Sequence, residues 1–501
     1  MRPERSVLLH GLAGAVFIVL ILFLTNPSFS ILEDETSIIV AANAPVAHTL
    51  ELFATGQGQH EHPPLSDLLL HFWLPVAGVN PSLVRLPSII FYAIALVTFA
   101  KAAQKLAGTT AFYATLFFGM VWPFGFHLGR LAGWYSFSFL LVGLLTLAYL
   151  YFVEAPSWPR WLLVFCASFA AVTANYFCWL VVAVIMLDTF LTLEYRLASR
   201  YVAAALTVLF VGYGPLWFTL AHEVQSVDPA KVGYGIVGTT LNAGFNLYAL
   251  FISESVAPWF WTISIPAGIA VAIALTTMPF LMEGRARRLY LFFLVLFGIM
   301  TAIGIMGTKR LLFISGWFLM GTGCALANLK RPRLRALLAA SLVFTLVVAW
   351  AGILSRRYYA APHYIEPWAV LAREAAQNIG RGQVVISNSP SFLFYLNASL
   401  GKLGLTTNGK PGWAAGPNVI SLVQSDVPER LPEKEIMFVR GVNTSATEVT
   451  AQTEKWIMSH CKLESSDRLL RDDGFELKKR FFHVAIDDPY RISVEEFDCR
   501  R

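Results

Sequence analysis

Three consecutive acids, Glu33, Asp34 and Glu35, stand between two apolar stretches near the start of the chain. Acids in such a place must lie at a membrane surface, where burial and neighbouring charge can tune a carboxylate to act as a general base. A base held there could remove the proton of an acceptor hydroxyl as that hydroxyl attacks an electrophilic carbon. The same residues also fit a solvated cluster of acids at the positive end of a helix, so both interpretations stand on composition alone.

Four basic residues mark the predicted outer ends of later apolar runs: Arg85, Arg130, Lys309 and Arg310. Cations placed there could neutralise the negative charge that grows on a departing phosphate. They could equally snorkel toward lipid headgroups, and each residue taken alone fits both interpretations. As a set beside an acidic loop, they favour an anion-binding site.

Histidines flank Glu61 in the segment His60-Glu61-His62. Histidine and carboxylate groups at this spacing can ligate zinc or a similar divalent ion. However, Pro63 and Pro64 follow directly, and they account for a rigid, extended backbone without any metal. We therefore expect no metal site, keep a divalent ion at His60 and His62 as the weaker alternative, and find no certain cofactor in the sequence.

These residues must be positioned by a membrane-embedded body. The 501 residues are 56% hydrophobic and only 14% charged, whereas soluble domains carry about 25% charged residues. Apolar runs long enough for a spanning helix of about 20 residues recur along the chain, which predicts an all-α polytopic body of about 11 transmembrane helices. The first run, Val7 to Thr25, has no small-residue cleavage site after it and is expected to stay as a signal anchor.

The distribution of Lys and Arg orients this body. They are concentrated in loops that place the N-terminus in the cytoplasm, require an odd number of spans and put the C-terminal tail outside. The net charge of +6 therefore reflects the membrane and predicts no nucleic-acid partner. Asp188 falls near the inner end of the run 177–193, where we expect an interfacial position, although an acid within a span is a functional suspect by default.

Two domains are expected. Residues 1–355 form the transmembrane module, with an outer loop over about 26–81 in which Leu65 to Val76 has the spacing of a helix lying in the membrane interface. Residues 356–501 alternate strand-like and helical stretches and predict a small extracytoplasmic α/β domain. In this exported tail a disulfide is chemically allowed, and we expect Cys461 to pair with Cys499.

Several short motifs occur in the order typical of one superfamily. Asp34-Glu35 opens the outer loop, His62-Pro63-Pro64-Leu65 follows, and Arg85-Leu86-Pro87-Ser88 opens the second span. With Gly129 to Ser136 further on, this order resembles the C-type glycosyltransferases, and within them the protein O-mannosyltransferases and the lipid A aminoarabinose transferases of families 39 and 83. The resemblance covers about residues 1–200 and recurs near 300–330.

This chain departs from the family pattern at two positions. Asn175 stands where many relatives have histidine, and Leu311 replaces the tyrosine of an Arg-Tyr pair that opens a late span.

The resemblance implies a polyprenyl-phosphate sugar as donor and an active site on the outer face of a bacterial inner membrane. It implies that Asp34 is the base, that Glu35 is the supporting acid or the alternative base, and that His62 contacts phosphate or shapes the loop. One carboxylate suffices for a single inverting displacement, in which the lipid phosphate leaves as an anion. The implied acceptor is an envelope glycolipid, lipid A or the lipopolysaccharide core, and the implied sugar is a uronic acid or an aminosugar.

Other functions remain open. A protein O-glycosyltransferase of the same superfamily would share these motifs. A transporter or flippase of a lipid-linked saccharide would share the topology, but the internal repeats and broken helices typical of transporters are not evident in the sequence. A ligase that moves whole glycans would be expected to have a large late outer loop, whereas here the early loop and the tail are the long outer segments.

Overall fold

A computed structural model of the chain describes residues 3–55, 63–78, 80–226, 235–304, 306–360, 362–400, 406–407, 410–411, 418–422, 434–441, 447–476 and 489–500. The chain divides into two units. The first comprises Met1–Thr25, Val46–Leu69 and Arg85–Ala360. The second comprises Asn26–Pro45, Leu70–Val84 and Ala361–Arg501. The division is therefore not a single cut near residue 356, because two pieces of the early outer loop group with the tail.

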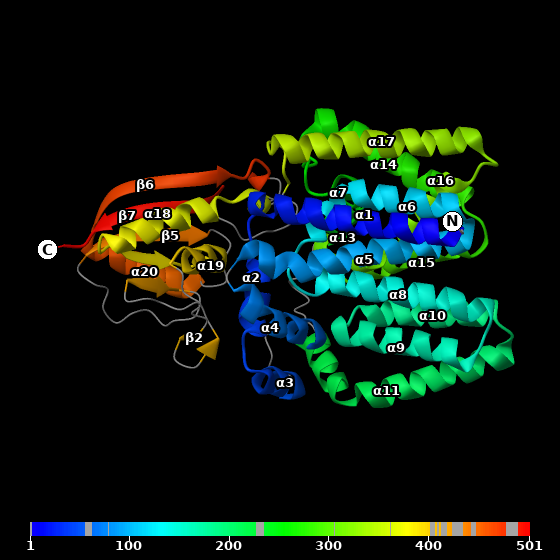
Figure 1. Ribbon diagram of the computed structural model, residues 1–501. Coiled ribbons are helices and arrows are strands. Elements are labelled where there is room, and N and C mark those ends of the chain that lie inside the picture. Colours follow the sequence, from blue (N-terminus) through cyan, green and yellow to red (C-terminus); the bar gives the residue numbers. More distant parts are fainter. Residues whose placement is uncertain are drawn as a thin grey trace. The chain divides into compact units, whose positions relative to one another are not determined.

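The first unit is helical (Figure 1). Its helices are α1 (Pro3–Thr25), α3 (Val46–Thr55), α5 (Pro81–Ala107), α6 (Thr109–Val121), α7 (Pro123–Leu128), α8 (Trp134–Glu154), α9 (Trp158–Ala174), α10 (Cys178–Thr192), α11 (Tyr195–Ser226), α13 (Gly235–Ile252), α14 (Trp261–Leu281), α15 (Gly284–Ala302), α16 (Thr308–Ala327) and α17 (Pro332–Ser355). Helix α4 (Leu65–Ala77) contributes to both units, and the first residues of α5, Pro81–Val84, belong to the second unit. Among the described residues, seven helices are long and apolar enough to cross a membrane, and five more apolar helices are shorter. The protein is a multi-pass membrane protein, and the count of about 11 spans stays a prediction.

Helices α5 and α8 run in the same direction. The rings of Phe91 and Phe137 lie 5.0 Å apart, and further along both helices those of Phe99 and Phe139 lie 4.9 Å apart. Residue numbers therefore increase together along the two helices. Because a helix advances about 1.5 Å per residue, these paired contacts place the N-terminal ends of α5 and α8 at the same end of the bundle.

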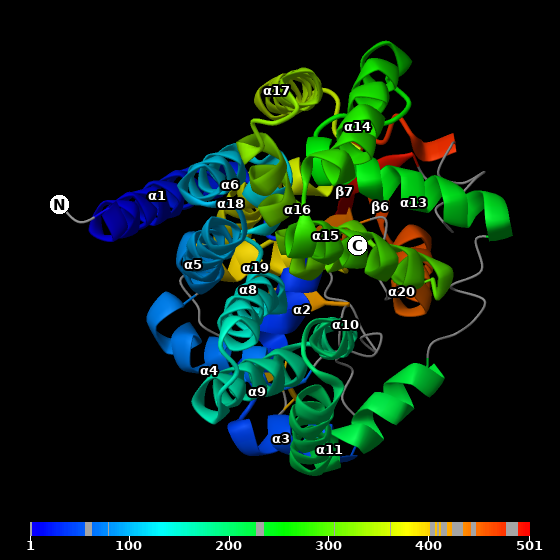
Figure 2. The same ribbon diagram turned by 90° about the vertical axis from the view of Figure 1, so that its right-hand side faces the viewer.

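Helix α16 also begins at that end. Gly108, at φ +83°, turns the chain back between α5 and α6, so α6 runs opposite to α5. Helix α6 touches α16 where Gly323 meets Thr115 and where Gly119 meets Leu319, so these two helices are also antiparallel. Figure 2 shows α6 beside α16, and α8 also packs against α16. The N-terminal ends of α5, α8 and α16 therefore share one end of the first unit.

The second unit contains a five-stranded sheet in the order β4-β1-β5-β7-β6. Strand β1 (Val384–Ser387) is parallel to β4 (Val419–Ser421) and β5 (Glu435–Gly441), whereas β7 (Tyr490–Asp498) is antiparallel to β5 and to β6 (Lys462–Arg471). The other elements are η1 (Asn26–Ser28), α2 (Glu33–Ala42), η2 (Pro362–Ile365), α18 (Trp368–Gly380), α19 (Pro390–Ser399), α20 (Thr447–His460) and the short pair β2 (Thr406–Thr407) and β3 (Lys410–Pro411). The core is Val384, Ile386, Ile436, Phe438, Ile457 and Phe497. The predicted fold class, a polytopic helical body with a small α/β domain, is confirmed.

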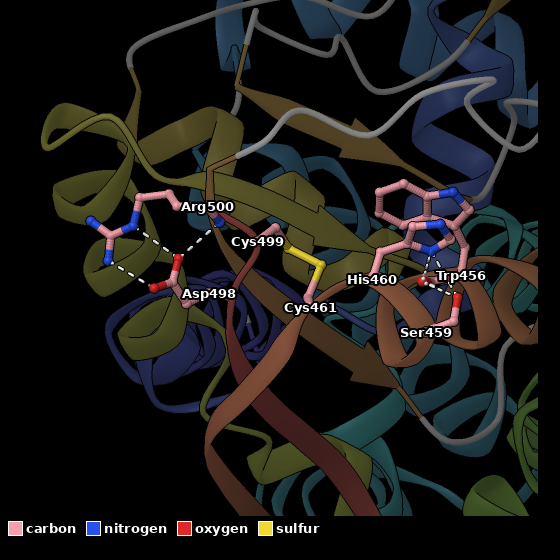
Figure 3. The surroundings of a disulfide bond; sticks show 7 residues. All are labelled: Trp456, Ser459, His460, Cys461, Asp498, Cys499 and Arg500. Atoms are coloured by element: carbon pink, nitrogen blue, oxygen red, sulfur yellow. Dashed lines mark hydrogen bonds and ion pairs between the residues drawn. A yellow bond between two sulfur atoms is a disulfide. The ribbon is translucent and has the colours of Figure 1, made fainter.

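A disulfide links the start of β6 to the end of β7, which lie side by side in this sheet (Figure 3). Cys461, between α20 and β6, is bonded to Cys499, directly after β7, at a separation of 38 residues. The expected pairing is thus present. Closing a loop of this length in the unfolded chain stabilises the fold by about 4 kcal/mol in the chain-entropy description. The bond holds the antiparallel β6–β7 pair at the edge of the sheet.

Candidate active site

The three acids form the first turn of α2. The Oε2 atom of Glu35 accepts a hydrogen bond from the backbone N–H of Leu32 at 2.9 Å, and the N–H of Thr36 donates to the carbonyl of Leu32 at 3.0 Å. Acids suit this place because the first N–H groups of a helix lack partners within the helix and carry partial positive charge. The sequence thus builds a well-defined helix start at the point where the acids occur.

Asp34 and Glu35 have different environments. The Glu35 side chain is fully buried, with 0% of its surface exposed, and it serves the helix cap. Asp34 is exposed in the same turn. Of the two candidate bases named from the sequence, only Asp34 presents its carboxylate where a substrate could reach it. Glu35 is placed to support the turn that carries Asp34.

Arg130 lies in the first unit, just before α8. Its side chain is 1% exposed. Its Nε atom donates to the carbonyl of Phe126 at 3.0 Å, a terminal nitrogen donates to Oγ1 of Thr25 at 3.1 Å, and the guanidinium lies 4.3 Å from the centre of the Phe126 ring. Thr25 is the last residue of α1 and precedes the acidic loop in the sequence. Arg130 therefore holds the C-terminal end of α1, the first apolar helix.

The other predicted cations lie at the same end of the first unit. Arg85 is near the start of α5 and is fully buried, while Lys309 and Arg310 are half-buried in the first turn of α16. The Arg310 guanidinium lies 5.6 Å from the centre of the Phe177 ring. Because α5, α8 and α16 start at one end, these four cations from distant parts of the sequence are gathered there. Burying an arginine is costly unless polar or anionic groups surround it, so this end of the bundle must provide such surroundings for Arg85 and Arg130.

His127 was not singled out from the sequence. Its Nδ1 atom lies 2.7 Å from Oγ of Ser253 and its Nε2 atom 2.9 Å from the hydroxyl of Tyr359, and the ring is fully buried. Ser253 ends α13 with a left-handed φ of +59°, which strains a residue other than glycine. The imidazole ties α7 to two distant segments directly beside Arg130. The only signal in the sequence was a histidine three residues before that arginine.

The weaker alternative from the sequence was a divalent metal ion held by two histidines of the early outer loop. His60 and His62 lie outside the described residues. Within the part of the chain that is described, no group of three or more His, Cys, Asp and Glu side chains is arranged to hold a metal ion. The expectation that there is no metal site therefore stays a prediction, as does the role of His62.

Asp188, which was expected near the inner membrane interface, is completely buried in the protein. Its Oδ1 atom lies 2.7 Å from Nε of Arg288, its Oδ2 atom accepts a hydrogen bond from the Tyr149 hydroxyl, and Arg285 approaches to 4.0 Å. The hydrophobic run alone could not reveal this, because the partners come from α8 and α15. Asp188 links three helices and belongs to the packing of the bundle.

Comparison with solved structures shows which known fold the chain has. No protein-family model matches the sequence, and a search of the curated proteins finds no match either. Among solved structures, ArnT from Cupriavidus metallidurans bound to undecaprenyl phosphate matches with a TM-score of 0.53 and 13% sequence identity, over 99% of this chain and 98% of that one. The apo state of ArnT from the same organism matches with a TM-score of 0.53 and 12% identity, over 98% of both chains.

This chain has the ArnT fold. Because the match extends over nearly all of both chains, the ArnT fold here includes the helical body and the tail. The fold implied by the resemblance to C-type glycosyltransferases is thereby confirmed. At 12–13% sequence identity, the similarity to ArnT concerns the fold alone.

Proposed function

We propose that this protein is an inverting glycosyltransferase that moves a single sugar from a polyprenyl-phosphate donor to an extracytoplasmic acceptor. The observation that carries the proposal is the pair of adjacent acids at the start of α2, in which Glu35 is buried as a cap and Asp34 is exposed. The solved ArnT that shares the fold binds undecaprenyl phosphate, a lipid of the proposed donor class.

Asp34 is the proposed base. Its carboxylate takes the proton of the acceptor hydroxyl as the hydroxyl oxygen attacks the anomeric carbon of the donor sugar. The new bond between this oxygen and the anomeric carbon forms as the bond from that carbon to the phosphate oxygen breaks, and the electron pair leaves with the phosphate. Attack from the face opposite the leaving group inverts the configuration, and Asp34 later returns its proton to water.

The gathered cations are the proposed donor-phosphate site. Arg85, Arg130, Lys309 and Arg310 would meet the negative charge that stays on the lipid phosphate, so no acid has to protonate the leaving group. His62 is a further candidate for phosphate contact. Within this proposal the donor reaches the site from the membrane, and the lipid portion contacts the apolar helices.

The acceptor belongs to the finer part of the proposal. We infer an envelope glycolipid, lipid A or the lipopolysaccharide core, in a bacterial inner membrane, with a uronic acid or an aminosugar as the transferred residue. This assigns the protein to lipopolysaccharide biosynthesis, with the N-terminus in the cytoplasm and the acids outside. A protein acceptor is the alternative within the same chemistry.

The test compares envelope lipids by mass spectrometry in cells that carry no gene, the wild-type gene or Asp34→Asn. Wild type should add the mass of one sugar to a lipid, and Asp34→Asn should lower transfer by about a hundredfold or more, because general-base catalysis contributes at least that much. Ser37→Ala, at an exposed position one turn further along α2, is the matched control. Full activity of Asp34→Asn in the membrane would refute the mechanism.

The transporter alternative gives a different result in sealed vesicles. It predicts movement of a lipid-linked sugar across the bilayer without any new glycosidic bond. Detection of such movement, with no mass change in any acceptor, would replace the transferase by a flippase.

A further inference from the structure

The segment that enters α2 is held by residues far along the chain. The N–H of Ile31 donates to the hydroxyl of Tyr395 at 2.9 Å, across a separation of 364 residues. The N–H of Ser30 donates to the carbonyl of Tyr364 at 3.0 Å, and the Ser30 hydroxyl donates to the carbonyl of Glu366. All these residues belong to the second unit, so the contacts lie within one compact part of the protein.

These hydrogen bonds are buried. Ile31 is 0% exposed, and Ser30, Tyr364 and Tyr395 are all below one tenth exposed. A buried N–H group that loses its partner is strongly disfavoured, so the Ile31 amide cannot leave Tyr395 without a replacement. The entry to α2 is thereby restricted to one backbone position.

The groups that hold this segment are themselves fixed. Tyr395 lies on α19, which begins directly after β1 with Ser389 as its cap, whose hydroxyl accepts the N–H of Phe392. The Glu366 carboxylate accepts hydrogen bonds from Nε1 of Trp368 at 2.7 Å and from Nε of Arg491 at 2.8 Å. Arg491 is on β7. The position of Ser30 and Ile31 is therefore set by the sheet of the tail.

Two successive amides place Asp34. Tyr395 holds the N–H of Ile31, and Glu35 holds the N–H of Leu32. Asp34 follows within the first turn, so these two bonds position the backbone that carries it. A reacting group displaced by about 1 Å can lose a hundredfold in rate, which makes such a support functionally important.

We propose that the C-terminal domain serves as the positioning element of the active site, with Tyr395 as the positioning residue that orients the Asp34 carboxylate through the backbone of Ile31. This inference rests on the proposed function for its effect on turnover. The contact through which Tyr395 acts is with the backbone, since its hydroxyl accepts the N–H of Ile31.

The test is Tyr395→Phe, which removes the hydroxyl and keeps the ring and its edge contact with Phe394. We expect kcat to fall between about tenfold and a hundredfold, with KM for the polyprenyl-phosphate sugar unchanged, since the bond that is removed lies within the second unit and the proposed phosphate cations belong to the first. Ser399→Ala removes another hydroxyl from α19, one that bonds only within its own helix, and should leave kcat unchanged.

Hydrogen exchange supplies a readout that does not depend on activity. In Tyr395→Phe, the amides of residues 30–36 should exchange faster, whereas those of β1 and β5 should not change. Ser30→Ala, which deletes only the bond to Glu366, should give a smaller effect in the same direction and serves if Tyr395→Phe does not fold. Unchanged exchange at residues 30–36, or an unchanged kcat, overturns the positioning role.

The two proposals fail differently. If Asp34→Asn keeps full transfer, the proposed function fails, whatever the exchange data show. If Asp34→Asn abolishes transfer while Tyr395→Phe has the kcat of the wild type, the transferase stands and the positioning role is wrong. A fall in kcat matched by a uniform loss of protection throughout the tail would identify a merely structural residue and also overturn the inference.

Discussion

The Glu35 carboxylate closes the first turn of α2 on Leu32, with Oε2 accepting the Leu32 N–H at 2.9 Å. In a capping box, a serine or threonine at the cap returns a second hydrogen bond. Leu32 has no side-chain acceptor, so this helix start has only the half of the box that Glu35 supplies. The two adjacent acids therefore differ: the buried Glu35 accepts a backbone hydrogen bond, whereas the exposed Asp34 is the proposed base.

Glu35→Gln and Glu35→Ala should therefore differ. The glutamine oxygen can still accept the Leu32 N–H, so Glu35→Gln should keep kcat within about tenfold of the wild type, far above Asp34→Asn. Glu35→Ala leaves a buried N–H without its partner and should lower the free energy of unfolding by about 1–3 kcal/mol. Turnover and thermal unfolding in detergent measure both effects. A larger loss of turnover in Glu35→Gln than in Asp34→Asn would make Glu35 the base.

Arg130 offers a test of the phosphate site. Arg130→Met should weaken binding of undecaprenyl phosphate by about tenfold to a hundredfold, as expected when a charge-assisted hydrogen bond worth about 1.5–3 kcal/mol is lost. Arg130→Lys keeps the charge but cannot reproduce both hydrogen bonds and the stacking on Phe126, so its loss should be intermediate. Arg373→Met, on the exposed face of α18, is the control. Unaltered lipid affinity in Arg130→Met, measured by native mass spectrometry, would remove this residue from the site.

Much of the tail could be predicted from local sequence patterns. The strand-like stretch 383–387 contains β1 (Val384–Ser387), and the helical stretch 447–460 is α20 (Thr447–His460). Such elements are marked by runs of β-branched residues or by helical spacing, which act over a few positions. The sequence also predicts that four cations lie at one end of the bundle, namely Arg85, Arg130, Lys309 and Arg310. Hydropathy and the bias of positive charge together determine which span ends face the same side of the membrane.

The features of the fold that could not be predicted depend on contacts between distant segments. Nothing in the local pattern links Ser30 to Glu366, 336 residues away, so the grouping of the early loop with the tail was missed. Helix α4 is a similar case. It forms as predicted, and its apolar residues Leu69 and Phe72 are exposed, but Asp67 on the other face is buried. Helical spacing gives the faces of a helix but not what covers each of them.

Asp67 predicts a pH dependence. Desolvation by burial raises its pKa from 3.8 to about 7. The folded protein therefore holds a proton that the unfolded chain releases, so this group's contribution to stability is complete below pH 4 and is lost as the pH rises to about 7. Asp67→Asn cannot ionise. Its unfolding temperature should equal that of the wild type near pH 4 and exceed it increasingly up to about pH 7.

Thermal unfolding in detergent between pH 4 and pH 8 checks the Asp67 prediction. Asp473→Asn removes an exposed carboxylate from the tail and is the matched control. A difference between Asp67→Asn and the wild type that stays the same over this range would mean that Asp67 is ionised throughout and has a partner that compensates its charge.

The buried acid Asp188 allows the packing of the bundle to be tested separately from the active site. Arg288 lies 2.7 Å from its carboxylate and Arg285 lies 4.0 Å away, so the two arginines are an internal comparison on one helix. Arg288→Met should lower the free energy of unfolding by about 2 kcal/mol, less than the 3–5 kcal/mol of a fully buried pair, because the Arg288 side chain is 37% exposed. Arg285→Met should lower the free energy of unfolding by clearly less than Arg288→Met.

A double-variant cycle decides whether Asp188 and Arg288 act as a pair. Asp188→Asn removes the charge but can still accept the hydrogen bond from Tyr149, so the third member of the cluster keeps its partner. The double variant Asp188→Asn with Arg288→Met should be destabilised by less than the sum of the two single variants. Each single variant leaves one charge of the pair without its partner, whereas the double variant removes both charges. Additive losses would show that each residue acts through other contacts, and that the ion pair between α10 and α15 contributes little to the stability of the membrane unit.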